Sequence, residues 1–408
     1  MAWTAWSVSR ALGVAALSGA LVYGWRGVIA TDGDVNLYFL WSYFFQHGVL
    51  PYRSFQIVYP PGVLMVMVLP ALSWVTYLGE FVVAALAVDA AVFAVLRRRG
   101  LAWGAWAWLV GAVVIGPVFW SRLDIFVAGA LVAAFMEVRS DRLVRGAAWL
   151  GVAASIKVWP LLLILPLLLR LTRRDRWRAG LAGLAAPGVL TLMVVVIGGS
   201  AQLWEVIREQ VGRGLEVESL FAWPLEMART LGLWSGAPVQ GLAWQFIGRP
   251  ATALGAVATA LLLLGVGVWA VRCLGRPPAA SAYPQLSLGL SVLIVATGKV
   301  LSAQYALWVL AAVAAVLDTL DLSVRRRLAI WSAFFFLTTQ ALFPFFYVQL
   351  LRGNWLGAVP ATLHLVATVG LLWVSASIAL GLPSAPTTEA PARHPPFRTL
   401  PAPKMVTL

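Results

Sequence analysis

Cysteine, histidine and charged residues are scarce in this chain of 408 residues. The single cysteine, Cys273, excludes a disulfide framework and a cysteine-cluster metal site. The three histidines, His47, His364 and His394, show no metal-ligand spacing. We therefore expect no bound metal and no other cofactor. Only 11% of the residues are charged, far fewer than the surface of a soluble protein of this length would carry.

Hydrophobic residues make up 61% of the chain and give a mean hydropathy of +0.86. Many apolar runs are long enough to cross a hydrocarbon layer of ~30 Å. These runs show no alternation with a period of two residues, which argues against the strands of a membrane barrel. The composition predicts an all-α, multi-span integral membrane protein.

Basic residues outnumber acidic ones by 30 to 16, for a net charge of +14. Such an excess also occurs in nucleic-acid-binding proteins, but here arginines cluster at the ends of every second apolar segment. This is the positive-inside pattern of cytoplasmic loops, which also contact anionic lipid head groups. We therefore expect membrane lipids, and no nucleic acid, as partners. The clusters are Arg97–Arg99, Arg139–Arg145, Arg170–Arg178, Arg272–Arg276 and Arg325–Arg327.

Placing these clusters inside predicts about twelve transmembrane helices, with both termini cytoplasmic. The N-terminal apolar run has no signal-peptide cleavage pattern, so we expect it to remain as the first spanning helix. Residues 60–72 are expected to form a short re-entrant or interfacial helix on the external side, limited by prolines. A broken hairpin is expected where two short spans meet at Lys157. The predicted spans are 9–30, 73–96, 101–119, 125–139, 146–157, 158–170, 180–199, 251–271, 284–300, 303–318, 328–346 and 356–377.

The same topology divides the chain into a membrane domain and a tail. Residues 1–380 form the membrane domain, with external loops at 31–62 and 200–250. Residues 381–408 contain many prolines and no apolar periodicity, which predicts a disordered cytoplasmic tail.

Polar residues from distant parts of the chain fall on the external face in this topology. Such convergence indicates an external active site for an anionic ligand. Any one of these arginines or tyrosines, taken alone, is equally consistent with anchoring a helix end. Lys157 lies within an apolar stretch and needs a partner, either a phosphate or Asp124. Asp89 is instead expected to form an interhelical hydrogen bond. The external residues are Asp32, Asp34, Arg53, Tyr59, Arg122, Asp124, Lys157, residues 213–219 and residues 299–305.

Several short motifs occur in a fixed order along residues 10–375. They are D-V-x-L-Y (34–38), G-V-L-P-Y-R (48–53), Y-P-P-G (59–62), R-x-D (122–124), K-V-W-P (157–160), R-G-L-E-V-E-S (213–219), G-K-V-L-S-A-Q-Y (298–305) and T-Q-x-x-F-P (339–344). This ordered set resembles the C-type (GT-C) membrane glycosyltransferases. The most similar branch is that of the bacterial polyprenyl-phosphate-dependent mannosyl- and arabinofuranosyltransferases.

The resemblance implies a GT-C-like fold and transfer of a sugar from a polyprenyl-phosphate donor to an acceptor hydroxyl. The sugar would be mannose or, second, arabinofuranose, and the acceptor a glycolipid, a glycan or a protein. Asp34 is the expected general base, with Asp32 as the alternative. Lys157 and Arg213, then Arg122 and Lys299, are expected to bind the donor phosphate. The expected substrate-binding residues are Tyr38, Tyr52, Arg53, Tyr59, Asp124, Glu218, Gln304 and Tyr305.

Two other function classes remain open at this point. A transporter or a flippase for lipid-linked sugars would also gather charges near membrane-embedded helix breaks, but it should show internal repeats and charges at the midplane. A non-enzymatic scaffold protein is the third possibility. The sequence shows no clear internal repeat, and its polar groups gather at one face, which favours the transferase.

Removal of the tail provides a first test. A chain ending at residue 381 should keep full sugar-transfer activity, because the tail carries none of the expected site residues. Transfer rates of the full and shortened chains, compared at equal amounts of folded protein, measure this. A large loss in a well-folded shortened chain would contradict it.

Overall fold

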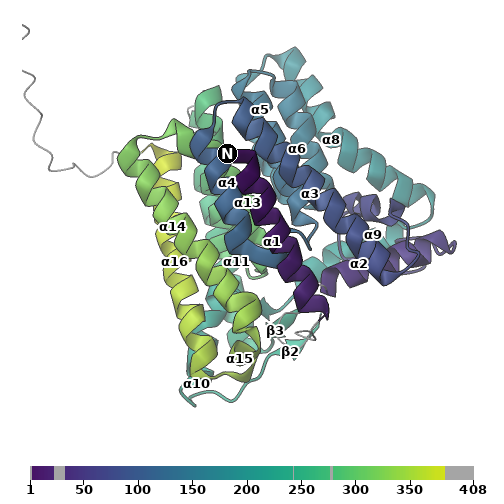
Figure 1. Ribbon diagram of the computed structural model, residues 1–408, viewed down its shortest axis with the longest axis vertical. Coiled ribbons are helices and arrows are strands. Elements are labelled where there is room, and N and C mark those ends of the chain that lie inside the picture. The colour runs from purple at the N-terminus through teal and green to yellow at the C-terminus, as the bar shows by residue number, and fades with distance from the viewer. Residues whose placement is uncertain (1, 23–32, 242, 276–278, 382–408) are drawn as a thin grey trace, which may run out of the picture.

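The computed structural model describes residues 2–22, 33–241, 243–275 and 279–381 of the chain (Figure 1). Within these residues the protein is almost entirely helical, with one small sheet. The helices are α1 (Ala2–Val22), α2 (Gly33–Gln46), η2 (Pro61–Val68), α3 (Trp74–Arg98), α4 (Ala102–Ile115), η3 (Gly116–Phe119), α5 (Asp124–Arg139), α6 (Leu143–Ile156), η4 (Trp159–Leu163), α7 (Ile164–Arg170), α8 (Arg173–Val196), α9 (Ser200–Gly212), η5 (Leu220–Ala222), α10 (Trp223–Thr230), α11 (Arg249–Gly275), η6 (Ala280–Ala282), α12 (Tyr283–Thr297), η7 (Ala303–Tyr305), α13 (Ala306–Val316), η8 (Leu317–Thr319), α14 (Leu322–Gln340), η9 (Ala341–Phe345), α15 (Tyr347–Arg352) and α16 (Trp355–Leu380).

Six helical segments of the described chain are long and apolar enough to cross a membrane, which makes this a multi-pass membrane protein. Four shorter apolar helices correspond to other expected spans. They contain 12 to 17 residues, or about 18 to 26 Å at 1.5 Å per residue. Each of the twelve predicted ranges overlaps a helix, but the number of spans stays a prediction. The long segments are Trp74–Arg98, Ala102–Phe119, Arg173–Val196, Arg249–Gly275, Leu322–Phe345 and Trp355–Leu380.

The segment expected to be the first external loop is partly helical. Helix α2 occupies fourteen of its residues, and the tract after Pro60 forms the 3₁₀ helix η2. At ~2 Å per residue, the eight residues of η2 span about 16 Å, too short to cross the membrane. This helix packs against α6, where a Cβ on Gly62 would overlap the backbone of Ser155. Its expected re-entrant or interfacial position stays a prediction.

The hairpin expected at Lys157 is broken at that residue. Helix α6 ends at Ile156, and Lys157 has an extended backbone, with φ −139° and ψ 121°. The 3₁₀ helix η4 then begins at Trp159, with Pro160 in its first turn, and α7 follows. A proline in this position lacks an amide hydrogen and cannot continue α6. The break leaves the lysine side chain at the end of a helix, inside the bundle.

The core of the bundle is formed by small and apolar side chains. Every residue of α13 is buried. Helices α6 and α8 approach closely because glycines face one another, and a Cβ on Gly151 would overlap the backbone of Gly183. Close approach through small residues is the usual way in which membrane helices gain packing contacts.

Residues 200–250, expected to be a loop, contain α9, α10 and a three-stranded antiparallel sheet. The strands are β1 (Leu215–Glu216), β2 (Val239–Gln240) and β3 (Trp244–Phe246), in the order β1-β3-β2. With α15 they lie at one end of the long helices α14 and α16 (Figure 1). A separate hydrophobic cluster that includes Leu215, Phe246 and Leu350 holds this part together.

A buried ion pair ties α1 to the bundle. The Arg10 Nε donates to Asp89 Oδ2 at 2.7 Å, and its Nη2 donates to Oδ1 at 2.8 Å. Trp108 Nε1 donates to the same carboxylate at 2.7 Å. The interhelical bond expected for Asp89 is confirmed. The first predicted span begins at residue 9, whereas α1 begins at Ala2, so Arg10 lies within the helix, where its partner on α3 compensates its burial.

This pair predicts the effect of removing one partner. Asp89→Ala should lower the free energy of unfolding by about 3–5 kcal/mol, because it leaves the arginine charge buried without a counter-ion. The double variant Arg10→Met/Asp89→Leu should be less destabilised, since neither charge remains. Thermal unfolding of the purified proteins in detergent measures both. A single variant that unfolds at the wild-type temperature would disprove the structural role.

Candidate functional site

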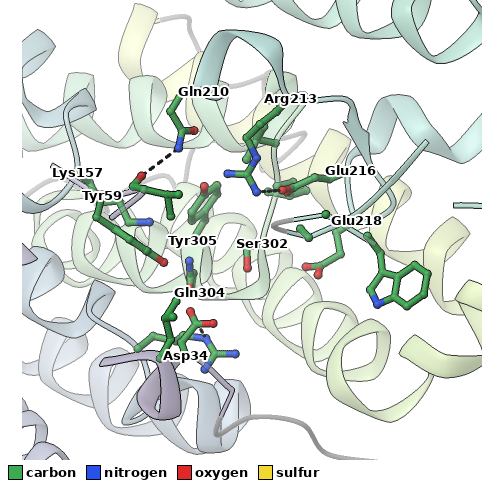
Figure 2. Close-up of a pocket in the computed structure, with 18 of the residues that line it drawn as sticks. Asp34, Tyr59, Lys157, Gln210, Arg213, Glu216, Glu218, Ser302, Gln304 and Tyr305 are labelled. Atoms are coloured by element: carbon green, nitrogen blue, oxygen red, sulfur yellow. Dashed lines mark hydrogen bonds and ion pairs between the residues drawn. The ribbon is translucent and has the colours of Figure 1, made fainter. Parts of the chain in front are cut away.

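A cavity of about 710 Å³ collects residues from distant segments of the chain (Figure 2). Its lining comes from the first turns of α2, the start of η2, the break after α6, the end of α9, strand β1 with its following turn, the β2–β3 hairpin, the segment around Ser302, and the region between α14 and α15. The cavity is large enough for a substrate of moderate size.

Asp34 lies in the first turn of α2 and lines this cavity. Arg122, two residues before the start of α5, approaches Asp34 with its Nε 3.2 Å from Asp34 Oδ2. The aspartate side chain is 33% exposed and the arginine side chain only 7%. The carboxylate therefore remains accessible from the cavity while a buried guanidinium holds it from behind. The N-terminal end of a helix also favours its negative charge.

Lys157 lies beside Asp124, with 3.9 Å between Nζ and Oδ1. Both aspartate oxygens lack a hydrogen-bond partner among the described residues. The ammonium group also faces aromatic rings, at 4.6 Å from the centroid of Tyr59 and 5.4 Å from that of Tyr305. Of the two partners expected for Lys157, a phosphate or Asp124, the structure shows the ion pair with Asp124. The aromatic rings add cation–π attraction.

Arg213 enters the cavity from the turn between α9 and β1. Its guanidinium forms an ion pair with Glu216, and its carbonyl oxygen accepts a hydrogen bond from Lys299 Nζ at 2.9 Å. Further bonds join this strand to the segment before η7. The amide of Glu216 donates to the Lys299 carbonyl at 3.0 Å, and Ser219 Oγ donates to the Gly298 carbonyl at 2.7 Å. The motifs at 213–219 and 298–305 are therefore neighbours.

Burial raises the pKa of both glutamates in this strand and turn. The pKa of Glu216 rises to about 7, although Arg213 beside it acts in the opposite direction. The pKa of Glu218 rises to about 8, first through burial and then through the charge of Glu216. The amide of Ala303 donates to Glu218 Oε2 at 2.9 Å and lowers the pKa in part. Near neutral pH this wall of the cavity therefore carries a protonatable carboxyl group.

The structure brings many of the predicted site residues to one place. Those that line the cavity are Asp34, Tyr59, Arg122, Lys157, Arg213, Glu218, Gln304 and Tyr305. Asp124 and Tyr38 are fully buried next to it. Asp32 lies outside the described residues.

Besides Asp124 and Tyr38, three predicted residues lie outside the lining. Tyr52 is buried, and its hydroxyl donates to the Tyr59 carbonyl at 2.6 Å, so it supports the tract that carries Tyr59. Arg53 is exposed and extends toward the carbonyl of Ile197. Lys299 is absent from the lining, but it donates a hydrogen bond to the carbonyl oxygen of Arg213, which does line the cavity.

Several lining residues were not singled out from the sequence. Ser302 and Glu216 lie within the quoted motifs, so their position was available as a signal. Trp244 and Tyr347 carried no such signal, because a hairpin and a helix kink bring them to the cavity.

Among the described residues, no three histidine, cysteine or carboxylate side chains are grouped so that they could hold a metal ion. The expectation of a metal-free site stays a prediction. The charged groups that are present suit the binding of an anion and the transfer of a proton.

Comparison with known proteins gives one match. The family model described as Glycosyltransferase family 87 matches residues 57–297, more than half of the chain. Searches of curated proteins and of solved structures found no match. The matched region contains Tyr59, Arg122, Lys157 and the 213–219 motif, all at the cavity, while Asp34 and Gln304 lie beyond its ends. The site is thus built largely from the matched region, and the chain belongs to glycosyltransferase family 87, a family of GT-C-type membrane glycosyltransferases.

Proposed function

We propose that this glycosyltransferase moves a sugar from a polyprenyl-phosphate donor to an acceptor hydroxyl, with Asp34 as the general base. The observation that carries the proposal is the cavity itself, which combines an accessible carboxylate, cations for a phosphate and an apolar opening. The resemblance of the sequence motifs favours mannose as the sugar, then arabinofuranose.

The donor phosphate is assigned to the part of the cavity between Lys157 and Arg213. The ring of Tyr305 lies between these two cations in Figure 2. Lysine supplies a point charge and arginine can bond two phosphate oxygens at once. As the bond to the sugar breaks, negative charge grows on the phosphate, and fixed cations in a dry cavity stabilise it. Arg122 adds positive charge from the side of Asp34.

The polyprenyl chain requires an apolar path that begins at the phosphate. Val58 and Val158 directly neighbour Tyr59 and Lys157 in the chain, and Val206 and Ile207 come from α9 on the same side of the cavity. Val158 is 61% exposed and Ile207 is 55% exposed, so this apolar lining reaches the surface of the bundle. A lipid tail leaving here would cover side chains that otherwise face the membrane.

The chemical step needs a base and a leaving group. The acceptor oxygen attacks the anomeric carbon, and the bond from that carbon to the phosphate oxygen breaks with its electron pair passing to the phosphate. Asp34 accepts the proton of the acceptor hydroxyl. Arg122 holds this carboxylate in place through their ion pair. Asp124 is less suited to the role, because it is fully buried and lies behind Lys157.

The proposed location of the reaction is the external face of the membrane. Helix α14 begins with the Arg325–Arg327 cluster, and its other end leads through η9 to Tyr347 at the cavity. Its 19 residues correspond to about 28 Å, close to the thickness of the hydrocarbon layer. With the arginines on the cytoplasmic side, as the positive-inside rule favours, the cavity opens externally.

Asp34→Asn tests the general base. The amide cannot accept the proton, so kcat should fall by ~10²- to 10⁴-fold with donor binding retained. Transfer from labelled polyprenyl-phosphate-mannose to a crude glycolipid and glycan fraction measures the rate, and a short-chain donor analogue measures binding. Glu205→Gln, a change on α9 of a carboxylate that is 33% exposed like that of Asp34, is the matched control. Unchanged transfer by the Asn variant would remove Asp34 from this role.

Lys157→Met tests the phosphate site. Loss of the charge-assisted bond between Lys157 and the donor phosphate should weaken donor binding roughly 10- to 100-fold. The control is Arg208→Gln, which changes an exposed residue on α9. Because the single change also leaves Asp124 without its cation, Lys157→Met/Asp124→Asn is measured in parallel to separate binding from folding. Wild-type donor affinity in a folded variant would place the phosphate elsewhere.

A further inference from the structure

A second, much smaller cavity adjoins the main one at Glu218. Its volume is about 10 Å³, and it shares Glu218, Ser302 and Tyr305 with the lining of the main cavity. Helices α14 and α16 contribute Thr339 and His364 to it. A space of this size fits one water molecule, provided that two to four polar groups face it. The polar side chains around this small cavity therefore decide what it can hold.

His364 has one ring nitrogen that is bonded within the protein and one that is not. The Thr338 hydroxyl donates to the carbonyl oxygens of Phe334 and Phe335, at 2.9 and 3.1 Å. Its oxygen therefore accepts the hydrogen of His364 Nδ1, 3.3 Å away. The ring is 4% exposed and has no ion-pair partner among the described residues, so it is uncharged, and its Nε2 is an acceptor. This Nε2 has no bond partner in the described chain and is not closed off from the small cavity.

Thr339 offers a second acceptor. Its hydroxyl donates to the Phe335 carbonyl at 2.7 Å, so its hydrogen is used within α14 while its oxygen can still accept. A water molecule bonded to His364 Nε2 and Thr339 Oγ1 would donate both of its hydrogens. Its oxygen would then accept hydrogen bonds from the remaining polar groups of the wall, the Glu218 carboxyl group and the Ser302 hydroxyl.

Glu218 is suited to donate such a hydrogen bond. The Ala303 amide donates to its Oε2 at 2.9 Å, so the other carboxyl oxygen is available. Burial, and next the charge of Glu216, raise the pKa of Glu218 to about 8, so the carboxyl group is mostly protonated at pH 7. The groups that face it are Glu216 on its own segment, Arg122 and Asp34 across the main cavity, Tyr347 on α15, and Tyr305 and His364 at the small cavity.

We propose that the small cavity binds one water molecule, which accepts a hydrogen bond from the Glu218 carboxyl group and donates to His364 and Thr339. Both of these are then positioning residues, which act through the water to keep Glu218 in its neutral form. An ionised Glu218 would add a negative charge to the cavity in which Lys157 and Arg213 bind a phosphate. The effect on the donor rests on the proposed function, whereas the water bridge does not.

The bridge acts on ionisation in one direction. A water molecule whose two hydrogens are both engaged can bond a protonated carboxyl group but not a carboxylate, so it raises the pKa of Glu218 further. As the pH rises through this pKa, the carboxyl group loses its proton, and donor affinity should fall roughly 3- to 30-fold. The sugar–phosphate diester of the donor keeps one negative charge throughout, so the change belongs to the protein.

The first measurement reads the proton on Glu218 in the full-length protein without any substrate. Its protonated carboxyl group should give an infrared band at pH 7 that disappears as the pH rises. Glu218→Gln identifies this band, because Glu216 titrates nearby. His364→Leu and Thr339→Val should each lower the midpoint by about half to one pH unit, the effect of one lost hydrogen bond.

Conservative variants separate the bridge from packing. His364→Gln and Thr339→Ser keep an acceptor at the small cavity and should stay near the wild-type midpoint. Thr368→Val is the control, because it changes a buried threonine on α16 whose hydroxyl donates to the His364 carbonyl and which lies outside both linings. Thr339→Val is nearly isosteric, so it still tests the bridge if His364→Leu fails to fold.

The second measurement is KM for a short-chain polyprenyl-phosphate-mannose over the same pH range. It should rise with the midpoint of the infrared band and shift with it in the variants. An unchanged midpoint in Thr339→Val and in folded His364→Leu would overturn the bridge, as would a Glu218 that is already ionised at pH 6. A donor KM that ignores the ionisation of Glu218 would overturn its effect on the donor. A band that shifts as expected in a protein that neither binds nor consumes the donor would leave the bridge standing and disprove the proposed function.

Discussion

Charged side chains inside an apolar bundle need partners of opposite charge. Here, the way in which each charge is paired distinguishes residues that hold helices together from residues of the candidate site. The Arg10–Asp89 pair is saturated: it has two short bonds, with a third from Trp108. The Lys157–Asp124 pair at the cavity is looser. Lys157 lies 3.9 Å from Asp124, whose oxygens have no hydrogen bonds among the described residues. A saturated pair holds helices together, whereas an unsaturated one retains capacity for a ligand.

The same constraint explains why the site lies where helices break. A continuous helix satisfies its own backbone and presents side chains only along its faces. The break after α6 brings Lys157 to a helix end, and the first turn of α2 brings Asp34 to another. The segment around Ser302 is short and irregular, and it is stabilised by bonds from the 213–219 turn. Several of the cavity-lining groups thus come from helix ends and turns, which a tightly packed bundle supports.

The sequence was informative wherever a single physical rule dominates. Hydropathy located the long apolar helices, because burial in lipid requires long apolar runs, but it missed α2, α9 and α10, which lie in segments expected to be loops. The interruption at Lys157 was predictable from Pro160, and an interhelical bond of Asp89 from the cost of burying its charge, although its partner Arg10 was not predicted. The small sheet in 200–250 was missed, since its strands of two or three residues are held by a hydrophobic cluster rather than by propensity. Tyr347 and Trp244 were missed because their approach to the cavity depends on tertiary packing. Tyr52 and Arg53 illustrate the converse: both belong to a motif but neither lines the cavity, since Tyr52 is buried and bonded to the Tyr59 carbonyl and Arg53 is exposed.

The asymmetry of the cavity gives the proposed reaction a direction. Its lining includes apolar side chains, such as Val158 and Ile207, that reach the surface of the bundle, and polar ones, such as Gln304, which lies next to Asp34 in Figure 2. A lipid-linked donor and a hydroxyl-bearing acceptor have opposite solvation requirements, so the apolar part of the cavity favours the lipid and the polar part favours the acceptor. In the proposed reaction, Asp34 would therefore take the proton of the acceptor, and Lys157 and Arg213 would bind the leaving phosphate.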